Sequence, residues 1–446
     1  MNEQIAGLVE RQTAAGESAN SGPNVAGPLP LRVNFLWTMG GNFVYAACQW
    51  AMLVTLAKLG TPQMVGQFAL ALAITAPVMI GFGLDLRSVL ATDARGQYPF
   101  RDYFMLRSLA MICAVVLVGC IVTAGGYGPY VAAVVVAVAF AKAFESISDI
   151  VYGLLQRNER MDRIALSMMI KGPLTLLALS VCIWLRRDLL SGVICMAMGW
   201  AGMMLFFDLP SARLCLGPAG HLPFKDIVRG GPRLNRLWRL SMLAAPVGFV
   251  MALASFNTGI PRYFIEKQFG SHDLGIFAAM AYPMVAGNTI VFALGQSASP
   301  RLAIYFAEGK CAAFWKLLLR LLSVGITIGA AGVVCIWGFG DTVLRLLYRP
   351  EYAGRGDVFL LLGSAAAVSY LGTLLGEAMC ATRHFRAQLP VFCSVTVAMA
   401  MSCWVLIPRS GLAGAALATV IASAVQTIGS ACVVIYAMKR RGASCE

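Results

Sequence analysis

Hydrophobic and polar positions follow one another in long blocks along this chain. Apolar runs of roughly 18–25 residues, the length of a helix that crosses a bilayer core, alternate with short clusters of charged residues. Twelve such runs can be drawn, at 33–57, 65–91, 104–125, 129–155, 164–185, 189–207, 236–258, 274–297, 314–338, 357–381, 388–407 and 412–437. The pattern predicts an all-α polytopic membrane protein with about twelve transmembrane helices.

The loops between these runs predict how the chain is organised. The longest, at 208–235, is basic and rich in Pro and Gly, and it divides the chain into two six-helix lobes. The expected segments are a disordered cytoplasmic tail at 1–32, lobes at 33–207 and 236–437 around a central cavity, a cytoplasmic linker at 208–235 and a tail at 438–446. Weak repeats support two related halves, because LGTPQMVGQFALALAITAP from Leu59 answers FGSHDLGIFAAMAYP from Phe269. Both stretches pass through G-x-F-A and then reach a proline.

Charge predicts the orientation. When the N-terminus is placed in the cytoplasm, the inside loops hold more than twice as many Lys and Arg residues as the outside loops. Both termini are therefore expected on the cytoplasmic side of the membrane. The net charge of +14 is then explained by topology, and no nucleic-acid partner is predicted. The 13 cysteines and three histidines show no metal-ligand spacing, so the cysteines are read as small packing residues and no metal site is predicted.

A stripe of ionisable residues lies within the fourth run. Lys142, Glu145 and Asp149, followed by Tyr152 and Gln156, share one helix face. Each charge near the bilayer centre costs about 2.5–3.5 kcal/mol, so the stripe must face the bundle interior or a wet cavity. Two interpretations stay open: a pair that merely holds helices together, or the lining of a transport path. Lys142 and Glu145 are expected to pair, and Asp149 needs a partner from another helix.

Further polar residues are candidates for cavity positions. For Asp149, the partner expected from another helix is Arg87, because both lie towards the cytoplasmic side. The candidate acids of the cavity, or of ion coupling, are Glu145, Asp149, Asp85 and Glu377, and the polar candidates are Asn257, Asn288, Tyr370 and Thr373. Lys171, in MIKGPL, lies inside a predicted helix and has no local partner.

Several segments resemble one known family. VGQFALALAITAP with LRSVLATD, FNTGIPRYFIEKQFG, GQSASPRLAIYFAEG and GLAGAALATVIAS are similar to bacterial polysaccharide exporters. These are O-antigen-type lipid-linked oligosaccharide flippases of the multidrug/oligosaccharidyl-lipid/polysaccharide superfamily. The resemblance covers residues 33–437. It implies two six-helix lobes in a V, alternating access, and a cationic cavity that receives the diphosphate of an undecaprenyl-linked sugar.

The resemblance also suggests which cations bind that diphosphate. Arg262 lies in the matched IPRY and Arg301 in the matched SPRL, while Lys142 and Arg87 are cationic positions in the first lobe. Arginine suits this task because its guanidinium binds phosphate in a bidentate fashion. No cofactor is predicted, and the coupling ion would be a proton or a sodium ion on Asp149 or Glu145.

The predicted function is a flippase for undecaprenyl-diphosphate-linked oligosaccharide in O-antigen, capsule or exopolysaccharide biosynthesis. Its expected partners are that glycan, membrane lipids, and a polysaccharide polymerase with a chain-length regulator. A cation-coupled multidrug antiporter of the same superfamily is the first alternative, and it would favour acidic and aromatic cavity residues. A membrane-embedded polymerase or ligase is the second, and it would need an extended outside loop, whereas the outside loops here are short.

Overall fold

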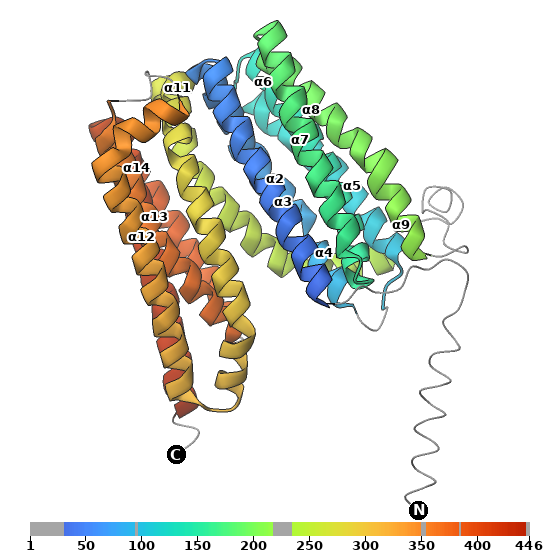
Figure 1. Ribbon diagram of the computed structural model, residues 1–446, viewed down its shortest axis with the longest axis vertical. Coiled ribbons are helices and arrows are strands. Elements are labelled where there is room, and N and C mark those ends of the chain that lie inside the picture. Colours follow the sequence, from blue (N-terminus) through green and yellow to red (C-terminus); the bar gives the residue numbers. More distant parts are fainter. Residues whose placement is uncertain (1–30, 94–96, 217–233, 349–353, 383–384, 443–446) are drawn as a thin grey trace, which may run out of the picture.

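The computed structural model describes residues 31–93, 97–216, 234–348, 354–382 and 385–442, and these residues are almost entirely helical (Figure 1). Nearly all of the predicted N-terminal tail, the middle of the predicted linker and the last four residues lie outside the described residues. The first lobe, the N-lobe, comprises α2 (Leu31–Leu59), α3 (Pro62–Gly83), α4 (Leu86–Thr92), α5 (Phe100–Ala124), α6 (Pro129–Arg157), α7 (Met161–Arg186), α8 (Leu189–Met203), the π-helix η1 (Met204–Asp208) and α9 (Leu209–Leu216).

The rest of the chain forms four long helical elements, namely α11 (Leu234–Ala307), α12 (Cys311–Leu347), α13 (Gly356–Ala381) and α14 (Phe385–Gly442). Two of them reverse direction at a single glycine in a non-helical conformation, α11 at Gly270 and α14 at Gly411. Nine helices of the described chain are long and apolar enough to span a membrane. Counting α11 and α14 as two helices each and adding α2, the described residues contain twelve membrane-length helices. The predicted fold class is confirmed.

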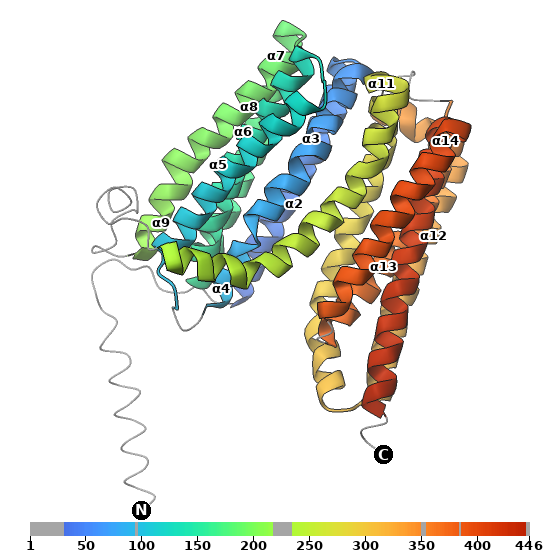
Figure 2. The same cartoon turned by 180° about the vertical axis from the view of Figure 1, so that it is seen from behind.

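The two lobes form a V. They meet at one end of the helices and diverge towards the end where α2 begins and α14 finishes (Figures 1 and 2). The first part of α11 lies across the diverging end of the N-lobe and then rises beside α3 to the meeting end. Leu240 and Ala244 of this part belong to the same buried cluster as Leu86 and Ile164 of the N-lobe. The first part of α11 therefore packs against the N-lobe on its way to the meeting end of the lobes.

The helix boundaries differ from the predicted ones where polar residues lie inside the protein. The run at 236–258 was expected to end before Arg262, but the helix of α11 continues through Arg262 and Glu266 as far as Gly270. Likewise, the linker expected from residue 208 begins as helix, and α9 ends only at Leu216. Polar residues that face a lobe interior need not interrupt a helix, since neighbouring helices satisfy them.

Small residues let α3 and α11 approach closely at the meeting end of the lobes. Gly66 and Gly275 are the glycines of the two G-x-F-A motifs, and they pack reciprocally across this contact. A Cβ on Gly66 would overlap the carbonyl group of Ser271, and one on Gly275 would overlap that of Pro62. Further along, the Tyr263 hydroxyl donates to the carbonyl of Ala73 at 2.5 Å. The sequence repeat thus corresponds to the contact that closes one end of the V.

We expect Gly275→Ala to destabilise the protein, because the added methyl group forces apart two backbones in contact. Overpacking of this kind costs about 1–3 kcal/mol. The matched control is Gly332→Ala on α12, where a Cβ meets nothing within 4 Å and replacing a helical glycine should be neutral or stabilising. Thermal unfolding in detergent compares the two variants. Equal melting temperatures would contradict a tight contact at Gly275.

Candidate functional site

The C-terminal lobe encloses a cavity of about 430 Å³ between α11, α13 and α14. Its lining is mostly apolar and aromatic, with a few polar groups, which is typical of small-molecule sites. The polar lining residues are Asn257, Thr258, Arg262, Asn288, Ser369, Tyr370, Thr419, Ser423 and Gln426. Arg262 is the one cation among the described residues of the lining, and no carboxylate lies among them.

The side chains of Arg262 and Asn257, both in the cavity lining, lack partners among the described residues. Among the described residues, no ion pair or hydrogen bond is formed by the Arg262 guanidinium. Asn257 is only 6% exposed, and neither its amide oxygen nor its amide nitrogen has a hydrogen-bond partner among the described residues. Buried polar groups are usually satisfied, so these two side chains are the candidates for hydrogen bonds to a polar ligand or to water in this cavity.

The local sequence explains why this part of α11 presents polar groups to the cavity. Pro261 has no N–H and cannot donate the helical hydrogen bond to the carbonyl of Asn257, four residues before it. Thr258 and Arg262 are four residues apart and share a helix face. One turn of helix therefore brings a guanidinium, an amide and a hydroxyl to the same wall.

The opposite wall contains the predicted polar residues of α11 and α13. The Thr373 hydroxyl donates to Asn288 Oδ1 at 3.1 Å, and the Tyr370 hydroxyl donates to the carbonyl of Met284 at 3.5 Å. Asn288 and Tyr370 line the cavity, while Thr373 contacts it through Asn288. The structure therefore brings Arg262, Asn257, Asn288 and Tyr370 together at one site, although they are far apart in the sequence.

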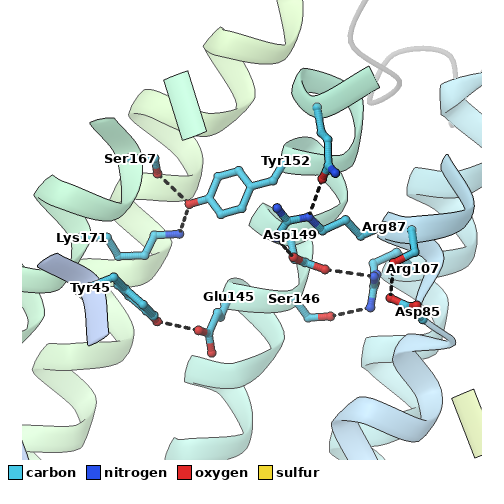
Figure 3. A network of polar contacts seen from close by, with 12 residues as sticks. Tyr45, Asp85, Arg87, Arg107, Glu145, Ser146, Asp149, Tyr152, Ser167 and Lys171 are labelled. Carbon is cyan, nitrogen blue, oxygen red and sulfur yellow. Dashed lines mark hydrogen bonds and ion pairs between the residues drawn. The ribbon is translucent and has the colours of Figure 1, made fainter. Parts of the chain in front are cut away.

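The N-lobe contains a separate network of polar contacts around the predicted stripe of α6 (Figure 3). Lys142 Nζ lies 2.7 Å from Glu145 Oε2, and the Tyr45 hydroxyl donates to Glu145 Oε1 at 2.6 Å. The Lys142 ammonium also lies 5.1 Å from the ring centre of Trp200, a cation–π distance. The expected pairing of Lys142 with Glu145 is confirmed, and the pair faces the interior of the N-lobe.

Asp149 accepts hydrogen bonds from two arginines. Arg87 Nη1 lies 2.9 Å from Asp149 Oδ1, which confirms the predicted partner, and Arg107 Nη2 lies 3.4 Å from Asp149 Oδ2. Arg87 also donates to Gln156 at 3.3 Å, and Arg107 donates to Ser146 at 3.1 Å. Arg107 lies inside the predicted run at 104–125, and its side chain is buried.

A further ion pair of the N-lobe, between Lys171 and Asp208, was not predicted. Lys171 Nζ lies 3.2 Å from Asp208 Oδ2, and both side chains are almost completely buried. Lys171 also donates to the Tyr152 hydroxyl at 3.0 Å, while Ser167 donates to Asp208 at 2.5 Å. Asp208 belongs to the π-helix η1, a type of irregularity that is frequent at functional sites. The sequence shows Lys171 without a local partner because that partner lies on another helix.

Of the remaining candidates, Arg301 and Glu377 are not brought into either cluster, while Asp85 lies at the edge of the N-lobe network, beside Arg107 (Figure 3). Arg301 is exposed near the diverging end of α11. Asp85 accepts a hydrogen bond from Ser88 at 2.9 Å in front of α4. Glu377 is half-buried against Gly295, and among the described residues it forms no ion pair. Of the four predicted phosphate-binding cations, Lys142 and Arg87 are paired with carboxylates, and Arg262 lies unpaired in a cavity.

Comparisons with known proteins agree with this architecture. No protein-family model matches the chain. The chain is 27% identical over 395 residues to the capsular polysaccharide biosynthesis protein CapF of Staphylococcus aureus, a match that covers 89% of this chain and 97% of that protein. A solved multidrug resistance MATE family transporter of the MOP superfamily, in its inward-facing conformation, superposes with a TM-score of 0.69 at 14% identity. That superposition covers 90% of this chain and 95% of the transporter chain.

The chain has the fold of the MOP-superfamily transporters.

The fold implied by the resemblance seen in the sequence is thereby confirmed. An outward-facing structure of a MATE family transporter also matches this MOP-fold chain, with a TM-score of 0.62 at 14% identity, covering 92% of this chain and 94% of that one.

Proposed function

We propose that this transporter is a flippase for undecaprenyl-diphosphate-linked oligosaccharide repeat units of a bacterial surface polysaccharide. The observation that carries the proposal is the unpaired guanidinium of Arg262, beside the unsatisfied amide of Asn257, in the cavity of the C-terminal lobe. The similarity to a capsular polysaccharide biosynthesis protein supports the same class of cargo.

The chemistry of the cavity suits an anionic sugar conjugate. A diphosphate accepts hydrogen bonds, so the five N–H donors of Arg262 and the amide N–H donors of Asn257 are complementary to it. Sugar rings have apolar faces and hydroxyl edges, which match the aromatic residues Phe277, Tyr370 and Phe392 and the polar residues of the opposite wall. The volume of about 430 Å³ holds only a part of a repeat unit together with its diphosphate, so the rest of the glycan would extend between the lobes.

The same lining argues against a cationic drug as the cargo. A multidrug antiporter for cations needs acidic cavity residues, whereas the described lining residues include no Asp or Glu. In the N-lobe, Glu145, Asp149 and Asp208 are each neutralised by a basic side chain. Arg262 would repel a cation from the cavity.

The proposed orientation places both termini and the diverging end of the V in the cytoplasm. The basic inside loops support it. The cargo is assembled on the cytoplasmic side, so the V would receive it there, and moving about two negative charges out of a negative interior is favoured by roughly 4.6 kcal/mol per 100 mV. A reporter that works only in the cytoplasm, fused after Glu446, tests this orientation.

Coupling to a proton or a sodium ion belongs to the proposal as well. Among the candidate acids, Glu377 is half-buried and has no ion-pair partner among the described residues, so it is free to take up a cation. Glu145 and Asp149 are held by their basic partners and are weaker candidates.

Transport in reconstituted vesicles tests the proposed cargo. Purified protein in liposomes should move a fluorescent polyprenyl-diphosphate sugar from one leaflet to the other, and the matching monophosphate should move more slowly because it offers Arg262 fewer oxygens. A cationic dye serves as the third substrate. Movement of the dye with no movement of the diphosphate sugar would contradict the proposal and favour the antiporter.

A further inference from the structure

Two cysteines of the N-lobe lie unusually close together. The Sγ atoms of Cys182 on α7 and Cys195 on α8 are 2.7 Å apart, and the structure holds both residues as thiols. Non-bonded heavy atoms prefer separations of about 3.5–4.0 Å, whereas a disulfide bond measures about 2.05 Å. The two sulfurs are thus closer than unbonded atoms prefer, and a small movement brings them to bonding distance.

The packing of α7 against α8 explains this proximity. The two helices are antiparallel and joined by a short turn, in which Arg187 is left-handed with φ of 52° and Asp188 caps α8 by accepting from the Ser191 N–H at 2.8 Å. Gly192 follows, and a Cβ placed there would lie 3.2 Å from the side chains of Ile183 and Leu179. The glycine, one turn before Cys195, allows the helices to approach closely enough for the sulfurs to meet.

The pair also lies near one face of the membrane. Cys182 is about 6 Å and Cys195 about 9 Å from the helix ends at this turn, at 1.5 Å per residue. The turn is at the end of the V opposite to the chain ends. In the orientation proposed above, on which this inference rests, that end faces the non-cytoplasmic side, where disulfides form and persist.

We propose that Cys182 and Cys195 form a disulfide in the mature protein. Thiol–disulfide exchange with an oxidant disulfide forms the bond. The Cys182 thiolate attacks one oxidant sulfur and gives a mixed disulfide, and Cys195 then attacks the Cys182 sulfur and releases the oxidant as a dithiol. The two protein thiols lose two protons and two electrons, and the oxidant gains them.

A disulfide here would be a second link between the two arms of the helical hairpin, which are α7 and the helix formed by α8 and η1. Lys171 on α7 pairs with Asp208, which follows α8, towards the other end of the hairpin. Lys171 lies about 16 Å from Cys182 along α7 at 1.5 Å per residue. With a link near each end, this hairpin would move as one body when the lobes rearrange.

Differential alkylation tests the proposal on the full-length protein in its membrane. Cells are quenched in acid and denatured, free thiols receive a first label, and a second label of different mass is added after reduction. Peptides containing Cys182 and Cys195 should carry the second label only. The exposed Cys113 and Cys432 serve as internal controls and should carry the first label.

Three further results test whether Cys182 and Cys195 are bonded to each other. In Cys182→Ser, Cys195 should switch to the first label, which shows that its protection came from a bond to Cys182 and not from poor access. Reductant should lower the melting temperature of the wild type but not that of Cys182→Ser. First label on both cysteines of the wild type would overturn the proposal. If both cysteines carry the first label and a reporter after Glu446 is cytoplasmic, the disulfide itself is refuted. If the reporter is not cytoplasmic, the proposed orientation is refuted instead. Transport of the diphosphate sugar is measured separately and tests the proposed function.

Discussion

Replacing Arg262 with Gln should strongly reduce export of surface polysaccharide while leaving the protein folded in the membrane. The guanidinium is unpaired among the described residues, so its removal strands no partner charge and the lobe should keep its stability. The loss falls on the cargo, because a charge-assisted hydrogen bond to the diphosphate is worth about 1.5–3 kcal/mol. Surface polysaccharide in cells and protein yield in the membrane are measured together.

The matched control is Lys267→Gln on the same helix. Lys267 is exposed near the Gly270 bend and does not line the cavity, so its loss should leave export unchanged. Arg262→Lys should restore part of the activity, since an ammonium keeps the charge but not the bidentate geometry. Normal export by Arg262→Gln would remove this residue from the proposed site.

Asp208→Asn should cause the largest loss of stability in the N-lobe. The substitution leaves the ammonium of Lys171 buried without its counter-charge, and breaking a buried pair in this way costs about 3–5 kcal/mol. Asp149→Asn should be milder, because Asp149 and Arg87 are each about one third exposed to screening solvent, and the buried Arg107 keeps its hydrogen bond to Ser146. Thermal unfolding in detergent measures both variants.

A double variant distinguishes an ion pair from a general packing effect. Lys171→Met combined with Asp208→Leu removes both charges, so it should be clearly more stable than Asp208→Asn alone. If the double variant is as unstable as the single one, the buried charge of Lys171 is not the cause. The hydrogen bonds that Ser167 donates to Asp208 and that Lys171 donates to Tyr152 would then have to be responsible.

The membrane helices could be predicted from sequence because each must present about twenty apolar residues to lipid. Their ends could not, wherever polar residues are satisfied inside a lobe. Arg262 and Glu266 look like the start of a loop in the sequence, yet they continue α11 up to Gly270. Hydropathy measures the preference of a segment for lipid, and it says little about which helix faces which.

The polar contacts also differ in how far the sequence predicts them. The pairing of Lys142 with Glu145 was predictable, because residues three apart on a helix face one another. Lys171 and Asp208 lie on different helices, and only the packing of α7 against the end of α8 brings them together. The charges of the stripe lie close together in the sequence and could be recognised there. Whether Arg262 is paired depends on which side chains of other helices lie around it, and the sequence does not show this.

Binding of a soluble short-chain polyprenyl diphosphate to the purified transporter tests the central claim most directly. Isothermal titration in detergent, with the wild type, Arg262→Gln and Lys267→Gln side by side, gives the three dissociation constants. The proposed site predicts that Arg262→Gln weakens binding by about 10- to 150-fold, the equivalent of about 1.5–3 kcal/mol, while Lys267→Gln binds like the wild type. Equal affinity of all three proteins for the diphosphate would contradict a cargo site at Arg262.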